Sequence, residues 1–119
     1  MKVEVTLDCR DLGRLTAFWS AVLGCDAPPP HAGGKYVTLA PAAGPVLTLQ
    51  QVPEAKAGKN RMHLDLLVSD PDAEAIRLES LGARRLTPSF TEMYGQRWLI
   101  LADPEGNEFC LAHGPGETG

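Results

Sequence analysis

The chain has 119 residues, of which 44% are hydrophobic and 22% are charged. These proportions are typical of a soluble globular protein, and the length suits one domain. The formal net charge is −4 without any run of Lys or Arg, so we expect no nucleic acid and no membrane surface as a partner. No stretch approaches the roughly 18 apolar residues that span a bilayer. The cysteines, Cys9, Cys25 and Cys110, show no CxxC spacing, which favours reduced thiols in a cytoplasmic protein.

The first half of the chain predicts a strand, a helix and two further strands. Residues 2–8 alternate between apolar and polar side chains, as a half-buried strand does. Asp11 is a suitable N-cap for a helix that ends at Gly24. The segment 25–34 contains three consecutive prolines and predicts a loop. The two further strands are expected at 35–40 and 46–52.

The second half predicts the same order of elements after a polar linker at 53–60. A strand that begins near His63 leads to Asp70-Pro71, which combines an N-cap with proline at the first helical position. This helix is expected to end at Gly82. Short strands are expected around 84–87, 96–102 and 107–112. Phe90, Met93 and Tyr94 fall in a long segment before Gly95 that is interpreted as a flap.

The two halves repeat each other in sequence. Residues 4–11 match residues 63–70, and each match leads into a helical stretch that closes at Leu-Gly. Residues 36–49 then match residues 98–111 without a gap. A repeat of this length indicates two copies of one supersecondary unit with a ligand site between them. We therefore predict a single domain over 1–119, composed of module one (1–52), the linker (53–60), module two (61–113) and a tail (114–119).

Strand alternation predicts which side chains face the cleft between the modules. Leu47, Leu49, Phe109 and Leu111 are expected to point to the helices. Trp98 and its counterpart Tyr36 offer stacking surfaces for a flat ligand, although Trp98 is equally suited to filling space between the modules. The expected cleft residues are Glu4, Thr6, Asp8, Tyr36, Thr48, Gln50, His63, Asp65, Trp98, Ile100, Glu108 and Cys110.

His63 is the strongest candidate for a reactive side chain. Residues i and i+2 of a strand point the same way, so Asp65 is placed to orient the His63 ring and to raise its basicity. Either His63 is a structural residue or it contacts a ligand and transfers protons, with Asp65 or Glu108 as the second acid or base. His31 and His113 are expected to be solvated.

The motifs in both halves resemble those of the vicinal oxygen chelate superfamily, which includes glyoxalase I, bleomycin-resistance proteins and extradiol dioxygenases. The matching residues are DLGRLTAFW and Leu-Gly in the first half, and MHLDL and DPEGNEFCL in the second. The resemblance covers nearly the whole chain and is nearest to the compact glyoxalase-like proteins. It implies an α+β fold in which two tandem βαβββ modules form a U-shaped mixed sheet around a cleft, usually in a homodimer.

The resemblance also implies four metal-binding positions, which fall at Glu4, Thr48, His63 and Cys110. Only His63 carries the usual residue. Glu4 replaces histidine, and Thr48 and Cys110 replace glutamates. A threonine hydroxyl is a poor ligand, and hard cations prefer carboxylate and imidazole to thiol. We therefore expect no metal cofactor; if a divalent ion (Zn, Fe, Mn or Ni) binds, Glu4, His63 and Cys110 are the expected ligands. Otherwise Cys110 is a small buried hydrophobe and Glu4 pairs with His63.

These observations favour a protein that binds a small organic ligand in the cleft, in the manner of bleomycin-resistance proteins, without the usual metal. The alternative is a glyoxalase-like lyase, isomerase or dioxygenase. Such an enzyme either uses a metal at Glu4, His63 and Cys110, or uses His63 with Asp65 or Glu108 without a metal.

Overall fold

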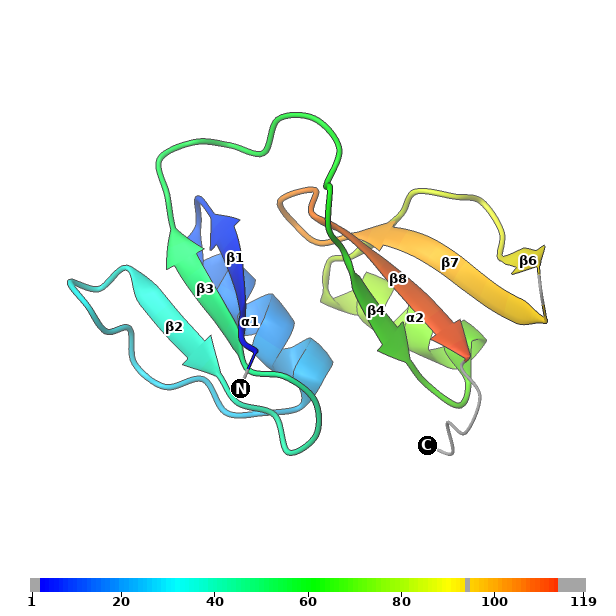
Figure 1. The fold of residues 1–119 in the computed structure, drawn as a ribbon, viewed down its shortest axis with the longest axis horizontal. Coiled ribbons are helices and arrows are strands. Elements are labelled where there is room, and N and C mark those ends of the chain that lie inside the picture. The colour runs from blue at the N-terminus through cyan, green and yellow to red at the C-terminus, as the bar shows by residue number, and fades with distance from the viewer. Residues whose placement is uncertain (1–2, 94, 114–119) are drawn as a thin grey trace. The chain divides into compact units, whose positions relative to one another are not determined.

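The structure, a computed structural model, describes residues 3–93 and 95–113. The chain forms two compact units, Met1–Lys56 and Ala57–Gly119 (Figure 1). The boundary between the units falls inside the segment 53–60, which the sequence predicts as a linker. The expected α+β fold is confirmed, since each unit combines one helix with a mixed sheet.

The N-terminal unit contains β1 (Val5–Cys9), α1 (Leu12–Leu23), β2 (Tyr36–Leu39) and β3 (Leu47–Gln51). Its sheet has the order β1-β3-β2, in which β1 is parallel and β2 antiparallel to β3. The central strand β3 buries Leu47 and Leu49, and α1 covers this face of the sheet.

Helix α1 begins and ends where the sequence predicts. The Asp11 carboxylate accepts a hydrogen bond from the Arg14 backbone N–H at 3.1 Å, which satisfies a donor that the first turn leaves unpaired. Gly24 ends the helix in the left-handed conformation, with φ of 66°, which a residue without Cβ adopts readily. Between these ends, Leu15, Phe18 and Trp19 form the buried stripe.

The first module differs from the sequence prediction where its first strand begins, and from the βαβββ unit implied by the family resemblance in its number of strands; the two strands predicted after the helix are confirmed. The first strand begins at Val5 instead of residue 2, and Glu4 lies before it. In addition, two strands follow α1, and the described residues between α1 and β2 form only an isolated bridge from His31 to Tyr36. The three prolines of this loop explain the missing strand, because proline has no N–H to donate to a ladder.

The C-terminal unit contains β4 (Leu64–Leu67), α2 (Pro71–Leu81), β5 (Arg84–Arg85), β6 (Thr91–Met93), β7 (Gln96–Ala102) and β8 (Glu108–His113). Its sheet has the order β4-β8-β7-β5, with β6 paired to β7. Strands β4 and β8 are parallel, and the β7–β8 and β5–β7 pairs are antiparallel. As predicted, Phe109 and Leu111 of β8 are buried, and α2 packs on this strand.

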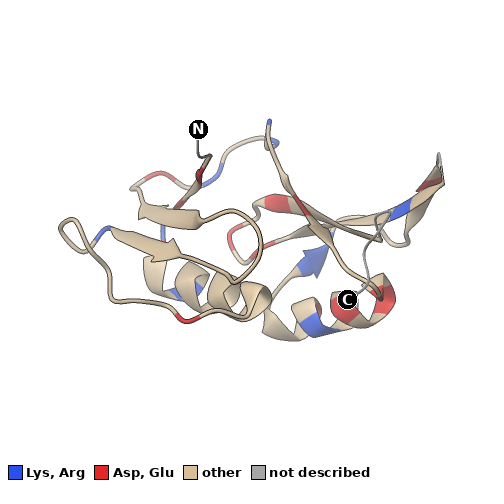
Figure 2. Cartoon of the chain, turned by 60° about the horizontal axis from the view of Figure 1, so that its bottom comes forward, with Lys and Arg blue, Asp and Glu red and all other residues tan. Residues whose placement is uncertain are grey.

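Helix α2 also confirms its predicted ends. The Asp70 carboxylate accepts a hydrogen bond from the Ala73 N–H at 3.1 Å, and Pro71 occupies the first helical position. Gly82 ends the helix with φ of 117°. The buried positions Ala75 and Leu78 give this helix a narrow apolar stripe. Figure 2 shows that both acidic and basic residues occur along this helix.

A buried polar turn joins β7 to β8. Asp103 is only 3% exposed, and its carboxylate accepts hydrogen bonds from the backbone N–H groups of Glu105 and Asn107 and from the Asn107 side-chain amide, at 2.9 Å each. A carboxylate that receives several donors can remain buried at little cost. The DPEGN sequence at 103–107 thereby fixes the connection between β7 and β8.

The segment interpreted as a flap contains a strand that pairs with β7. Thr91–Met93 form β6, which pairs antiparallel with β7. The Arg97 guanidinium lies over the Phe90 ring at 3.7 Å and makes two hydrogen bonds of 3.0 Å to Asp72 of α2. These contacts attach the hairpin to the helix. Tyr94 lies outside the described residues.

None of the three cysteines is in a disulfide. Within residues 3–93 and 95–113, neither helix is long and apolar enough to cross a membrane.

Candidate functional site

The sheet of the C-terminal unit places the predicted reactive residues on one face. Strand β4 pairs with β8 so that Asp65 lies opposite Cys110. His63 immediately precedes β4, two residues before Asp65, and therefore points to the same side. On the far side of β8, Ile100 of β7 lies opposite Cys110, and Trp98 lies opposite Ala112.

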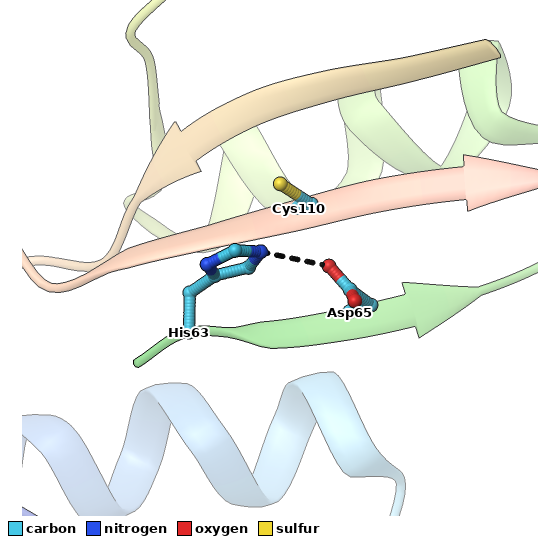
Figure 3. Close-up of side chains that lie close together, drawn as sticks. All are labelled: His63, Asp65 and Cys110. Carbon is cyan, nitrogen blue, oxygen red and sulfur yellow. Dashed lines mark ion pairs between the residues drawn. The ribbon is translucent and has the colours of Figure 1, made fainter. Parts of the chain in front are cut away.

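His63 and Asp65 form the ion pair that the strand spacing predicts. The His63 Nε2 atom lies 3.2 Å from the Asp65 Oδ1 atom, and both side chains are about half exposed (49% and 59%). Figure 3 shows the two side chains rising from the same strand, with the Cys110 side chain on the neighbouring strand. The carboxylate thus orients one nitrogen of the imidazole ring.

Cys110 is half-buried and stays protonated at neutral pH. Burial first, and then the negative charge of the nearby Asp65 carboxylate, together raise the pKa of its thiol to about 11. Cys110 is therefore a weak nucleophile in the protein as described, since the thiolate is the reactive form.

These side chains line a pocket with a volume of about 330 Å³. This volume lies near the lower end of the range of about 300–1,000 Å³ for small-molecule sites. His63, Asp65 and Cys110 form one part of the lining, and Trp98 is its largest apolar side chain. The full lining is His63, Asp65, Leu67, Gln96, Trp98, Cys110, Ala112 and His113.

Several lining residues were not among the predicted site residues. Leu67, Gln96 and Ala112 each lie two residues from a predicted member on the same strand. Strand alternation extended by one step would have found them. His113 is exposed, as expected, but it belongs to the end of β8 and lines the pocket. No local signal in the sequence indicated this.

Glu108 and Ile100 do not line this pocket. The Glu108 carboxylate accepts a hydrogen bond from the Asn60 backbone N–H at 3.0 Å and pairs with Lys59 at 3.3 Å. Its side chain therefore attaches the segment before β4 to β8. This contact gives Glu108 a structural role in the C-terminal unit.

The remaining predicted site residues lie in the N-terminal unit. Thr6 and Thr48 are register partners, as are Asp8 and Gln50. The Gln50 amide donates to the Tyr36 hydroxyl at 3.0 Å, and the Thr48 and Thr38 hydroxyls lie 3.3 Å apart. The structure thus brings Thr6, Asp8, Tyr36, Thr48 and Gln50 onto one polar sheet face.

The donor set of the C-terminal unit suits a divalent ion of intermediate hardness. Donor atoms of His63, Asp65 and Cys110 all lie within 4.8 Å of one another. Imidazole, carboxylate and thiolate are the protein ligands of zinc, whereas manganese and magnesium prefer oxygen. Asp65, which the sequence assigns to orienting the ring, therefore belongs to the same cluster as His63 and Cys110.

The fold agrees with the comparisons to known proteins. The family model described as "Glyoxalase-like domain" matches residues 4–112. The chain therefore belongs to the glyoxalase-like domain family, within the vicinal oxygen chelate superfamily that its motifs resemble. No curated protein matches the chain.

Solved structures show the same fold at low sequence identity. A glyoxalase/bleomycin resistance protein/dioxygenase family enzyme from Burkholderia phytofirmans PsJN has a TM-score of 0.78 and 17% identity, over 92% of this chain and 95% of that one. A glyoxalase-related enzyme from Fulvimarina pelagi has a TM-score of 0.74 and 22% identity, over 97% and 89%. A mutant of the fosfomycin resistance protein FosX from Listeria monocytogenes, complexed with Mn(II) and 1S,2S-dihydroxypropylphosphonic acid, has a TM-score of 0.77 and 20% identity, over 95% and 89%.

Proposed function

We propose that the protein binds a small organic molecule in the pocket of the C-terminal unit. The observation that carries this proposal is the combination, in one pocket of about 330 Å³, of the Trp98 ring with the His63–Asp65 pair. Apolar pockets with a few convergent polar groups are the usual form of small-molecule sites. Family membership supports the proposal, because the superfamily includes resistance proteins that bind organic compounds.

The chemistry of the lining defines the kind of ligand. Trp98, Leu67 and Ala112 offer an apolar surface on which a flat or aliphatic group can lie. His63 and Asp65 offer a hydrogen-bond donor and acceptors at the other part of the lining. We expect a ligand that carries an apolar or aromatic body and one polar group.

Tryptophan fluorescence provides the test. Trp19 is buried in the N-terminal unit and Trp98 lines the pocket, so a ligand in the pocket should change the emission of Trp98. Chelator-treated protein would be titrated with a panel of aromatic compounds that carry one hydroxyl, amine or carboxylate group. We expect saturable binding at one site per chain, weakened about 5- to 30-fold in Trp98→Ala, as measured by calorimetry. Ile76→Ala, an exposed position on α2, is the matched control. A panel without a single saturable binder would refute the proposal.

A second candidate function is proton transfer by His63, and the 3.2 Å contact with Asp65 favours it. In this reaction the imidazole takes a proton from a bound substrate and returns it to another atom, while Asp65 holds the ring in place. Turnover of a compound found to bind should show a bell-shaped pH dependence. That activity should be lost in His63→Ala and retained in His31→Ala, and equal activity of both variants would exclude this role.

A further inference from the structure

We infer that His63, Asp65 and Cys110 form a three-ligand site for a zinc-type divalent ion, contained entirely in the C-terminal unit. The metal positions implied by the family resemblance draw on both halves of the chain and do not include Asp65. The ligand set inferred here therefore differs from that pattern in both the third ligand and the preferred ion.

The geometry of the three donors is the first argument. In a tetrahedral site with bonds of about 2.0–2.3 Å, ligand atoms lie about 3.3–3.8 Å apart. The His63 Nε2 and Asp65 Oδ1 atoms are already 3.2 Å apart, and no pair of donors in the cluster exceeds 4.8 Å. Side-chain rotations that move the donor atoms by about an ångström would bring all three within bonding distance of one ion.

The backbone that carries the donors is the second argument. Asp65 and Cys110 are register partners on the parallel strands β4 and β8, and His63 is two residues from Asp65 on the same face. Two of the three donors are thus carried by paired strand positions, and the third immediately precedes β4. Sites built on strands hold ligands more closely than sites built on loops.

The openness of the site is the third argument. His63 and Asp65 are about half exposed and border the pocket that also contains Trp98. Three protein ligands with an accessible fourth position are typical of catalytic rather than structural zinc sites. The fourth position would face the pocket, where water or the polar group of a ligand can reach it.

The chemistry of Cys110 decides which ion is preferred. A thiolate ligand favours zinc and cobalt(II) over manganese(II) and magnesium, which prefer oxygen donors. Metal binding must remove the proton of the Cys110 thiol, so binding should release protons. A carboxylate in place of the Cys110 thiol would instead favour manganese(II) or magnesium.

Cobalt(II) is the probe for the test, because a thiolate bound to cobalt(II) gives an absorption band that imidazole and carboxylate do not give. Chelator-treated full-length protein would be titrated with cobalt(II) without any organic ligand. We expect one equivalent to bind with a thiolate-to-metal band, zinc to displace it, and manganese(II) to bind at least about tenfold more weakly. The band should disappear in Cys110→Ser, and Asp65→Asn should weaken binding at least about tenfold. Circular dichroism would verify that each variant is folded.

Matched variants separate this ligand set from the alternatives. Cys25→Ser and Asp26→Asn remove the same groups elsewhere and should bind cobalt(II) as the unaltered protein does. Glu4→Gln should also bind normally. The inference fails if no thiolate band forms, if the band persists in Cys110→Ser, or if Glu4→Gln loses binding while Asp65→Asn retains it. The inferred metal site lies in the pocket of the proposed function. The two proposals are tested separately, because cobalt(II) is titrated without organic compounds and the organic compounds are titrated against chelator-treated protein.

Discussion

The Asp103 turn gives the most definite prediction about stability. Replacing Asp103 by alanine removes the acceptor of three donors, which are the backbone N–H groups of Glu105 and Asn107 and the Asn107 amide. Asn107 is only 9% exposed, so water cannot readily replace the lost acceptor for its two donors. A buried donor without a partner costs about 1–3 kcal/mol. The Glu105 N–H is more accessible and should contribute less, so we expect Asp103→Ala to lower the free energy of unfolding by about 2–5 kcal/mol.

The assay is urea unfolding followed by far-ultraviolet circular dichroism. If the slope of the unfolding free energy against urea concentration is unchanged, the shift of the unfolding midpoint reports a change in stability. Glu105→Gln is the matched control, because it alters a partly exposed carboxylate of the same turn and leaves Asp103 in place; we expect a change within about 0.5 kcal/mol. Because Asp103 and Asn107 share hydrogen bonds, the double variant Asp103→Ala/Asn107→Ala should be more stable than the sum of the single losses implies, by at least about 0.5 kcal/mol. A loss below about 1 kcal/mol in Asp103→Ala, or additive single losses, would refute the reasoning.

Two further predictions follow from the pKa shifts. Because the pKa of the Cys110 thiol is raised to about 11, the thiolate fraction of Cys110 at pH 8 should be about 200-fold smaller than that of a thiol with pKa near 8.5, so alkylation of metal-free protein at Cys110 should be much slower, and Asp65→Asn should increase its rate. Equal rates in peptide mass spectrometry would contradict the expectation. Hydrogen bonds from Arg97 lower the pKa of Asp72 below 3.8, so this pair stabilises the folded state above pH 3.8 and the contribution is lost as the pH falls through the lowered pKa. In Asp72→Asn, thermal unfolding should therefore depend less on pH between about 2 and 5, and an unchanged pH profile would exclude a role of the ion pair.

The helix ends show how much of the fold could be predicted locally. Asp11 and Asp70 cap their helices, and Gly24 and Gly82 end them in the left-handed conformation. Each of these features depends on a few adjacent residues, so the sequence alone determines it. The buried strand positions Leu49 and Leu111 follow from alternation for the same reason.

The candidate site was predicted only in part. The His63–Asp65 contact follows from the spacing of two residues on one strand. That Asp65 belongs with Cys110 follows from the pairing of β4 with β8, strands separated by a helix and three other strands. Likewise, the contact of Glu108 with Asn60 and Lys59 depends on distant segments lying together. No local pattern specifies such neighbours.

The sequence by itself therefore determined the order of elements other than β6, the helix ends, the core faces and the family resemblance, because these depend on local backbone preferences and on the period of apolar residues. The tertiary structure decided the strand register, the burial of the Asp103 turn and the attachment of the β6–β7 hairpin through Arg97. It also decided that imidazole, carboxylate and thiol lie together in one unit. These features arise from contacts between residues far apart in the chain, and packing of the whole unit selects them.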